Sequence, residues 1–294
     1  MELYDKKQVR EVQKKALEIL KYFQAFCNTY GIRFYVGSGC CIGAVRNKGF
    51  IPWDDDIDIF LLRDDYEKLA LIWNKYADTK HYSYCRTNEY ENYHDAGASI
   101  RDNYTTFINK HCVNEDINHG LQIDLIPIDK RATDGWAHKK QVFFAMMYSL
   151  FNTQRLPDNQ GKLARILAKI IFKIIKNHKL RTFIWKYAEN KMQIRDDNKW
   201  DGYTELVTGF KGLTLKYPIE FFSTPKLIDF ESIKIPVYSQ YEKYLKMVFG
   251  NYMELPPKEE RIPKHNTVFV DMNHGYKKYR GKYYLSMHLE RDKK

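Results

Sequence analysis

The stretch Phe50-Ile51-Pro52-Trp53-Asp54-Asp55-Asp56-Ile57-Asp58-Ile59-Phe60-Leu61 is the most informative part of this sequence. We interpret its second part, from Asp54 to Leu61, as a β-strand. In a strand, side chains two positions apart share a face, so Asp54, Asp56 and Asp58 point the same way, and Ile57 and Ile59 point the other way into a core. The stretch therefore predicts a row of carboxylates on one rigid strand face.

Carboxylates on one face repel one another unless a cation lies between them. Mg²⁺ and Mn²⁺ suit such a place, because these hard ions take carboxylate, water and phosphate oxygens. An acidic run is ordinarily a solvated turn, but apolar residues flank this one, and burying carboxylates without a partner is costly. A calcium-binding loop is excluded, because two of its required positions do not match. Ile59 occupies the position where the sharp turn needs glycine, and Asp65 occupies the position where the loop needs a glutamate ligand. We expect a magnesium or manganese site.

Upstream, Gly37-Ser38-Gly39 lies between a predicted strand and the start of a predicted helix. Glycines at such a turn let backbone N–H groups approach a phosphate, and the helix N-terminus adds favourable polarity. The turn is neither a Walker loop nor a dinucleotide fingerprint, since no Gly-Lys-Ser/Thr and no third glycine follow. Arg46 and Lys48 lie between this turn and the acidic stretch, either as ordinary surface charges or as a phosphate clamp.

The order of predicted elements indicates a mixed α/β (α+β) fold. We expect helices over residues 7–30 and 40–46, and a third helix from residue 65 or 66 that Asp64 caps. Strands are expected over residues 32–36, 82–86, 98–101, 105–108 and 121–128. The chain then divides into a catalytic core over 1–135, a helical subdomain over 136–200 and a C-terminal segment over 201–294 that packs back on the core.

Composition narrows the class of protein. The chain has 294 residues, of which 44% are hydrophobic, so it can bury a sizeable core. Its 48 Lys and Arg against 37 Asp and Glu give a net charge of +11, which favours anionic partners. No apolar run is long enough to span a membrane and no signal peptide is expected. Five scattered cysteines without a Cys-x-x-Cys pair argue against disulfides or zinc, so we expect reduced thiols in a cytoplasmic protein.

Three stretches together resemble one family. They are Gly37–Gly39 continued by Ile42–Ile59, then Arg63-Asp64-Asp65-Tyr66-Glu67-Lys68-Leu69, and near the C-terminus Phe249–Arg261. They are similar to the signature of the LicD family, the cytidine-diphospho-alcohol-dependent phosphotransferases of the nucleotidyltransferase superfamily. One departure is Asn47, where a histidine is expected. The resemblance implies a nucleotidyltransferase-like mixed sheet core with flanking helices over most of the chain.

The resemblance also implies roles for three carboxylates. Asp56 and Asp58 correspond to the Asp-x-Asp pair that holds Mg²⁺ or Mn²⁺ and serves catalysis. A third catalytic and metal-holding carboxylate stands on a later strand in this superfamily. Asp124 is the best candidate, because apolar residues alternate with it, and Asp129 is the fallback, in a position that reads as a loop or helix cap.

The implied reaction transfers a phospho-alcohol group from a CDP-alcohol, CDP-choline being the best guess, to a sugar hydroxyl of a cell-surface glycan precursor such as teichoic acid, capsule or lipopolysaccharide. CMP is released. The donor would bind over Gly37, Ser38 and Gly39 with Arg46 and Lys48 on its phosphates, and Asp54 would support the site. Trp53 is the nearest aromatic side chain for a choline ammonium, although a core tryptophan is the plainer interpretation.

Other functions stay open at this point. A polyol-phosphate transferase with ribitol or glycerol phosphate is possible within the family, and so is a nucleotidyltransferase that uses an NTP and releases pyrophosphate. A non-catalytic nucleic-acid binder is remote, because the basic residues are dispersed and no recognition motif is present.

Residues 162–176 form a basic amphipathic pattern. Seven apolar residues share one helical stripe, and five basic residues lie opposite: Lys162, Arg165, Lys169, Lys173 and Lys176. Such a helix either packs in a core with a solvated basic face or contacts an anionic membrane surface.

Overall fold

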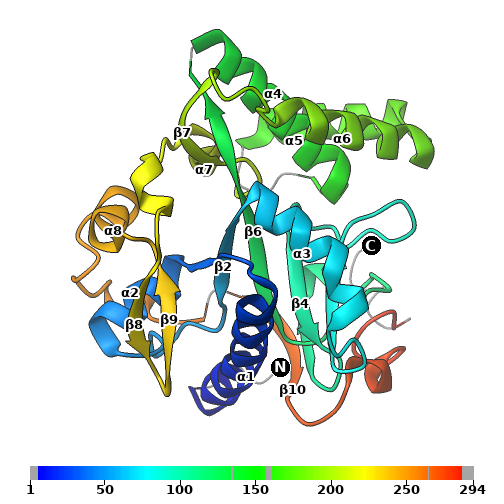
Figure 1. The fold of residues 1–294 in the computed structure, drawn as a ribbon. Coiled ribbons are helices and arrows are strands. Elements are labelled where there is room, and N and C mark those ends of the chain that lie inside the picture. The colour runs from blue at the N-terminus through cyan, green and yellow to red at the C-terminus, as the bar shows by residue number, and fades with distance from the viewer. Residues whose placement is uncertain (1–5, 134, 157–160, 264, 287–294) are drawn as a thin grey trace. The chain divides into compact units, whose positions relative to one another are not determined.

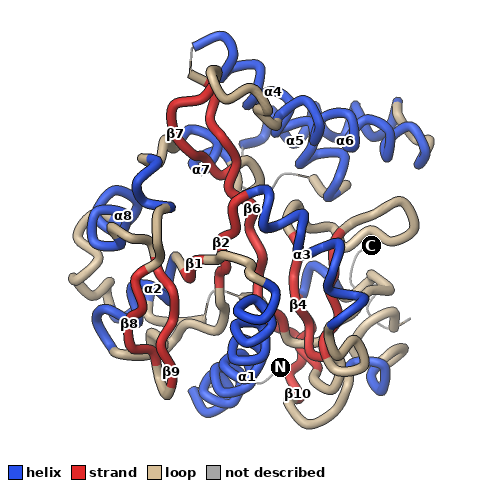
Figure 2. The backbone as a smooth tube through the Cα atoms, viewed as in Figure 1, coloured by secondary structure: helices blue, strands red, loops and turns tan. Residues whose placement is uncertain are grey.

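The computed structural model describes residues 6–133, 135–156, 161–263 and 265–286. The chain divides into two compact units (Figures 1 and 2). Unit 1 comprises Met1–Cys85, Ser99–Leu125 and Ser223–Lys294, and unit 2 comprises Arg86–Ala98 and Ile126–Phe222. The domain bounds expected from the sequence stay a prediction.

Unit 1 contains a mixed sheet in the order β1-β2-β6-β4-β3. Its strands are β1 (Tyr35–Val36), β2 (Asp58–Leu62), β3 (Tyr82–Arg86), β4 (Ala98–Asp102) and the first part of β6 (Gln122–Ala132). Strands β1 and β2 are antiparallel, with Val36 opposite Ile59. Two antiparallel pairs stand beside this sheet: β5 (Thr106–Asn109) with β10 (Thr267–Asp271), and β8 (Lys226–Phe230) with β9 (Ile233–Val237).

The helices of unit 1 bury one apolar face each, as their sequence periodicity predicts. They are α1 (Lys6–Tyr30), α2 (Ser38–Asn47), α3 (Arg63–Tyr76) and α8 (Tyr241–Phe249), with short 3-10 turns at Lys110–Cys112, Lys258–Glu260 and Tyr276–Tyr279. Phe23 of α1 is fully buried, and the ring of Phe26 lies 4.6 Å from that of Trp73 on α3. Helix α1 ends at Tyr30 because Gly31 follows with a left-handed φ of +61°.

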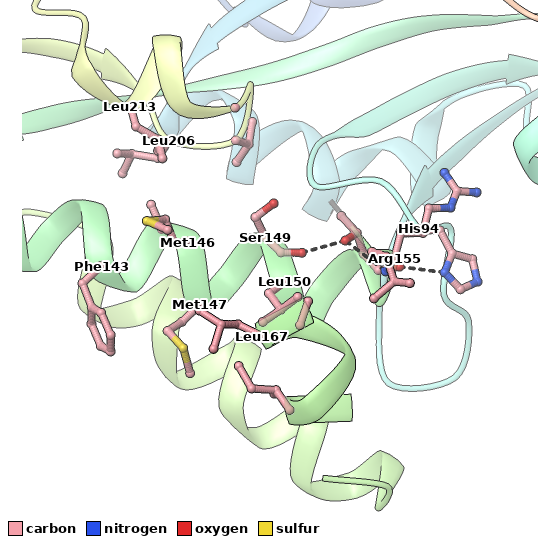
Figure 3. A pocket seen from close by; sticks show the side chains of 17 residues that line it. His94, Phe143, Met146, Met147, Ser149, Leu150, Arg155, Leu167, Leu206 and Leu213 are labelled. Atoms are coloured by element: carbon pink, nitrogen blue, oxygen red, sulfur yellow. Dashed lines mark hydrogen bonds between the residues drawn. The ribbon is translucent and has the colours of Figure 1, made fainter. Parts of the chain in front are cut away.

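Unit 2 is mainly helical. It contains α4 (Gly135–Thr153), α5 (Gly161–Ile174), α6 (His178–Met192), α7 (Phe210–Thr214) and the 3-10 turn Ile219–Phe222, and its strand β7 (Trp200–Glu205) pairs antiparallel with the later part of β6. The buried side chains of Tyr148, Trp185, Met192 and Leu206 form its core. Helices α4 and α5 and the segment before α7 line an apolar pocket (Figure 3).

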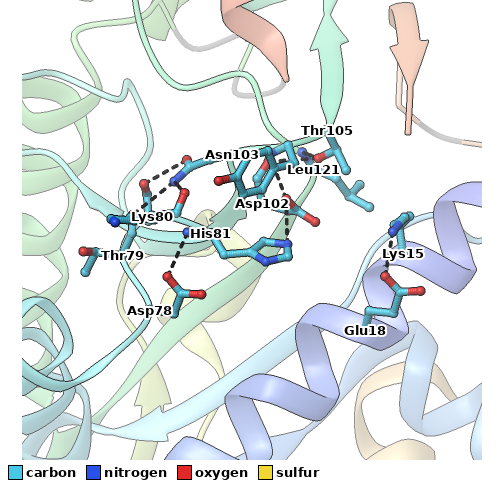
Figure 4. Close-up of polar contacts among 12 residues, drawn as sticks. Lys15, Glu18, Asp78, Thr79, Lys80, His81, Asp102, Asn103, Thr105 and Leu121 are labelled. Atoms are coloured by element: carbon cyan, nitrogen blue, oxygen red, sulfur yellow. Dashed lines mark hydrogen bonds and ion pairs between the residues drawn. The ribbon is translucent and has the colours of Figure 1, made fainter. Parts of the chain in front are cut away.

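Polar contacts fasten the start of β3 to the end of β4 in unit 1 (Figure 4). The Asn103 amide donates to the carbonyl oxygens of Thr79 and Lys80 at 3.2 and 3.0 Å. His81 Nε2 lies 3.3 Å from the buried carboxylate of Asp102. The two Asn103 bonds satisfy backbone carbonyls of the turn before β3, and the His81–Asp102 contact joins side chains of the same two segments.

The structure confirms the mixed fold and corrects three local expectations. Strand β2 begins at Asp58, not Asp54, because β1 ends at Val36 and the last bond between the two segments is Gly37 N–H to the Asp58 carbonyl at 3.1 Å. Ile57 still accepts a hydrogen bond from the Asp124 N–H of β6, but the residues from Asp54 to Asp56 lie in no strand. Helix α3 begins at Arg63, and Asp64 lies inside its first turn rather than capping it. The strand expected over 32–36 is confined to two residues.

Candidate active site

Gly37 joins β1 to α2, which begins at Ser38 rather than at the expected residue 40, so Ser38 and Gly39 of the predicted turn form the first residues of the helix. A Cβ atom on Gly37 would fall 2.4 Å from the Phe60 ring, and Ser38 adopts a left-handed φ of +46°. The Ser38 N–H donates to the Tyr244 hydroxyl at 3.2 Å. The turn therefore needs glycine for steric reasons, and Tyr244 of α8 satisfies one of its N–H groups.

Gly39 brings this turn against the acidic loop. A Cβ atom at Gly39 would lie only 2.2 Å from Asp54 Oδ2. The Cys40 thiol, in the first turn of α2, lies 3.3 Å from the Asp56 carbonyl and donates to it. The glycine turn and the carboxylates that the sequence placed separately thus form one site.

The backbone of the acidic loop is held by α1. The buried Gln13 amide donates to the carbonyl oxygens of Ile51 and Asp54 at 3.0 and 2.7 Å. Asp54 Oδ2 is buried and has no hydrogen-bond partner among the described residues. Burial, and then the negative charge of Asp56, raise the pKa of the Asp54 carboxyl to about 8. The loop therefore brings carboxyl groups so close together, where little water reaches them, that Asp54 is mostly protonated at neutral pH.

His265 supplies the counter-charge from a distant part of the chain. Its Nδ1 lies 2.8 Å from Oδ1 of Asp55, a residue only 4% exposed, and its Nε2 lies 4.0 Å from Asp56 Oδ2. Burial lowers the pKa of His265, but the hydrogen bond and charge of Asp55, aided by Asp56 and Asp124, outweigh it and raise the pKa to about 9. The imidazolium thus sits among three carboxylates.

Asp124 reaches the same site from β6. Its backbone N–H donates to the Ile57 carbonyl at 2.9 Å, which sets β6 beside the end of the acidic loop. Ile123 and Leu125 are buried while Asp124 is half-buried, so the alternation inferred from the sequence is present. Its Oδ1 accepts a 2.6 Å hydrogen bond from the Gln122 amide. The fallback Asp129 is buried within β6 in unit 2, not in a loop.

The other predicted donor-binding residues are placed as follows. Arg46 Nη1 donates to the carbonyl oxygens of Tyr252 and Glu254 at 3.2 and 3.4 Å. Lys48 is exposed and ends α2 with a left-handed φ of +58°. Their contact with phosphate stays a prediction.

Trp53 is half-buried rather than a core residue, and the Arg261 guanidinium lies 5.8 Å from its ring centroid. Burial, and then the charge of Arg261, lower the pKa of Arg46. The guanidinium groups of Arg46 and Arg261 are thus close enough to repel each other, and that of Arg261 also faces the Trp53 ring. An anion between them would relieve that repulsion.

The Mg²⁺ or Mn²⁺ site predicted from the sequence depends on which side chains of this region could act as metal ligands. In the described ranges, no three His, Cys, Asp or Glu side chains stand as a ready coordination shell. The chemistry nevertheless fits a hard divalent cation, because Asp54, Asp56, Asp58 and Asp124 offer only carboxylate oxygens. The buried Oδ2 atoms of Asp54 and Asp55 have no hydrogen-bond partner among the described residues. Such orphaned oxygens would be satisfied by a cation or by its water ligands.

Sequence reasoning missed Asp55, Tyr244 and His265. Asp55 was passed over because strand alternation assigned it to the apolar face. The other two lie 206 and 210 residues from their partners, so no local spacing marks them. One signal for Tyr244 existed: it lies just before the C-terminal stretch Phe249–Arg261 that carries part of the family resemblance.

Comparison with known proteins shows which family this chain resembles. Residues 31–163 match the model of the LicD/FKTN/FKRP nucleotidyltransferase domain. A lipopolysaccharide cholinephosphotransferase LicD of Haemophilus influenzae is 30% identical over 265 residues, which are 87% of this chain and 96% of that protein. Uncharacterised proteins of Rickettsia typhi and Rickettsia prowazekii are 37% identical over 62 and 69 residues, and these segments are 20% and 26% of their lengths. The chain belongs to the LicD/FKTN/FKRP nucleotidyltransferase domain family.

Proposed function

We propose that this chain transfers phosphocholine from CDP-choline to a sugar hydroxyl of a cell-surface glycan precursor and releases CMP. The observation that carries the proposal is the convergence of the glycine turn, the acidic loop and Asp124 on one site in unit 1. The similarity to a cholinephosphotransferase over nearly its full length supports the choline donor.

We assign some residues of the site to binding the donor phosphates and others to binding a divalent cation. The Gly39 N–H, Arg46 and Lys48 would hold the donor pyrophosphate, since the N–H groups of Gly37 and Ser38 already donate to Asp58 and Tyr244. Asp56, Asp58 and Asp124 would hold Mg²⁺ or Mn²⁺, with Asp54 supporting them. When bound, the cation neutralises phosphate oxygens as charge shifts in the transition state.

In the proposed step, the acceptor hydroxyl oxygen forms a bond to the phosphorus that carries choline. The bond from that phosphorus to the oxygen of CMP breaks, and CMP leaves with the electron pair. Asp124 accepts the hydroxyl proton. The hydrogen bond from Gln122 would orient the Asp124 carboxylate for this role.

The donor choline would need contact with an aromatic face, because a quaternary ammonium is attracted to a ring quadrupole. Trp53 directly precedes the acidic loop, and the Arg261 guanidinium lies 5.8 Å from its ring centroid. We propose that choline replaces the Arg261 guanidinium over this ring, while Arg261 turns to the phosphates.

The test is donor turnover by the purified chain with CDP-choline, CDP-ribitol or CDP-glycerol and Mg²⁺, measured as CMP release. Asp56→Asn and Asp58→Asn should each lower turnover by roughly two to four orders of magnitude while the fold survives. Asp64→Asn, an exposed aspartate in the first turn of α3, is the matched control and should keep normal turnover. Near-normal turnover in both site variants would contradict the assignment.

The products separate the alternatives. Turnover of a CDP-polyol in preference to CDP-choline would indicate a polyol-phosphate transferase with the same site. Pyrophosphate release from an NTP would indicate nucleotidyl transfer. We propose a cytoplasmic reaction, because five scattered cysteines without a Cys-x-x-Cys pair are expected to stay reduced thiols.

A further inference from the structure

Helix α5 in unit 2 exposes a broad apolar surface. The sequence predicts a single apolar stripe on this helix, but the structure divides that stripe. Ala168 is buried, and Ile171 and the following Ile175 pack against the unit 2 core. The remaining apolar side chains are between 49% and 75% exposed: Leu163, Ile166, Leu167, Ile170 and Ile174.

These exposed residues form one continuous face, because they are spaced three and four positions apart along the helix. Leu167 also belongs to the rim of the apolar pocket, a cavity of about 530 Å³ that Phe143, Met146 and Leu150 of α4 help to line (Figure 3). Phe143 and Met146 are themselves 56% and 46% exposed. The apolar surface therefore extends from α5 across to α4, which is more than scattered single residues would give.

A basic face borders the apolar one on α5. It consists of Lys162, Arg165, Lys169 and Lys173 on the helix and Lys176 just after its end, all of which are exposed. No acidic residue occurs between Gly161 and Ala188. A second copy of the chain seated on this face would bring like charges together, so self-association is unfavourable here.

A partner for α5 must therefore be apolar in its interior and anionic at its surface. An anionic lipid bilayer has both properties. The helix is too short and too charged to cross that bilayer, and in the ranges that the structure describes no helix is long and apolar enough to do so. It can lie in the plane of the headgroups instead.

We propose that unit 2 docks on an anionic membrane surface through α5. Ile166, Ile170 and their neighbours enter the headgroup region, and the lysines contact lipid phosphates. The pocket beside Leu167 then opens toward acyl chains. This inference rests on unit 2 alone and does not depend on the reaction proposed for unit 1.

The experiment is flotation of the full chain with phosphatidylcholine vesicles, with and without phosphatidylglycerol. We expect the chain to float with the anionic vesicles and to remain behind with the neutral ones, and raised salt should weaken the binding. Ile166→Ser with Ile170→Ser should reduce the bound fraction roughly tenfold or more, because two half-exposed apolar side chains lose their insertion energy. Ile174→Ser, at a site 75% exposed, provides a single variant that leaves the core of unit 2 untouched.

Leu71→Ser is the matched control. Leu71 is 81% exposed on α3 in unit 1, so its replacement should leave vesicle binding unchanged. Equal flotation on neutral and anionic vesicles, or wild-type binding by both α5 variants, would overturn the proposal. A dimer in size-exclusion chromatography that Ile166→Ser with Ile170→Ser dissociates would also overturn it, because a second copy would then cover α5.

Discussion

Replacement of Gly39 by alanine tests directly whether the glycine turn and the acidic loop form one site. The new Cβ atom would lie 2.2 Å from Asp54 Oδ2, whereas ordinary van der Waals contact begins at 3.4 Å. The carboxyl must therefore retreat by about 1 Å, yet Gln13 holds the Asp54 carbonyl at 2.7 Å. Overpacking of this kind costs about 1–3 kcal/mol, and the better helix propensity of alanine returns up to about 1 kcal/mol. We expect a net loss of about 1–2 kcal/mol.

The same substitution should slow catalysis more than its stability cost suggests. A displacement of about 1 Å in a reacting group can lower the rate by roughly a hundredfold. Stability is measured by urea denaturation, and turnover by CMP release from the CDP-alcohol that the wild-type chain uses. Gly135→Ala is the matched control, because no atom lies within 4 Å of the added Cβ there. It should be neutral or slightly stabilising.

A double variant sharpens the test. In an Asp54→Ala background the clashing oxygen is absent, so Gly39→Ala should then cost little or should stabilise the chain. The reasoning would be refuted if Gly39→Ala lost the same free energy of unfolding in both backgrounds. It would also be refuted if Gly39→Ala behaved like the control in both stability and turnover.

Two further predictions follow from side-chain contacts in the described residues. Arg10 donates two hydrogen bonds of 2.9 and 2.7 Å to Glu231, and they hold the pKa of that carboxyl below its usual value. Glu231→Gln should therefore lower the free energy of unfolding by about 0.5–1 kcal/mol at neutral pH, since the pair is partly exposed. A carboxyl with a lowered pKa stabilises the folded chain above its unfolded pKa of 4.5, and this contribution is lost as the pH falls through the folded pKa. In urea melts at decreasing pH, the difference in unfolding free energy between Glu231→Gln and wild type should therefore vanish. A difference that stays constant with pH would contradict the prediction. Among the five cysteines, Cys112 is half-exposed and the other four are buried, burial raising the pKa of Cys41 to about 12. A thiol reagent should modify only Cys112 quickly in the native chain and all five after unfolding, and rapid native modification of more than one would contradict this burial.

The sequence predicts well those elements whose pattern of apolar residues lies within one short segment. Helix α1 shows apolar residues at helical spacing and ends at a glycine, and the structure places it within one residue of the expected bounds. The alternation around Asp124 is confirmed for a similar reason, since the residues on either side of it are apolar and buried, while its catalytic role stays a prediction. Where apolar residues recur at helical or strand spacing, that spacing predicts the secondary structure and the buried face.

Contacts between distant segments leave no such pattern. His265 approaches Asp55 across 210 residues, and Tyr244 approaches Ser38 across 206. Nothing in the spacing of either residue shows that it closes the site. The start of β2 was missed for a related reason: a strand needs a partner, and β1 has only two residues to offer.

The loop found where the sequence predicts a strand, over residues 54–57, changes how the carboxylates are arranged. In a strand, Asp54 and Asp56 would share one face and Asp55 would point away from them. In the loop that the structure shows, each of the three consecutive carboxylates has its own neighbour: Asp54 lies against Gly39, Asp55 pairs with His265, and Asp56 lies between them within reach of the same imidazole. A loop held at its carbonyl oxygens can direct adjacent carboxylates toward one centre, which a strand cannot do. The departure from strand geometry therefore brings three adjacent carboxylates close together, two of them beside one imidazole, which is the concentration of carboxylate oxygens that the proposed divalent cation would need.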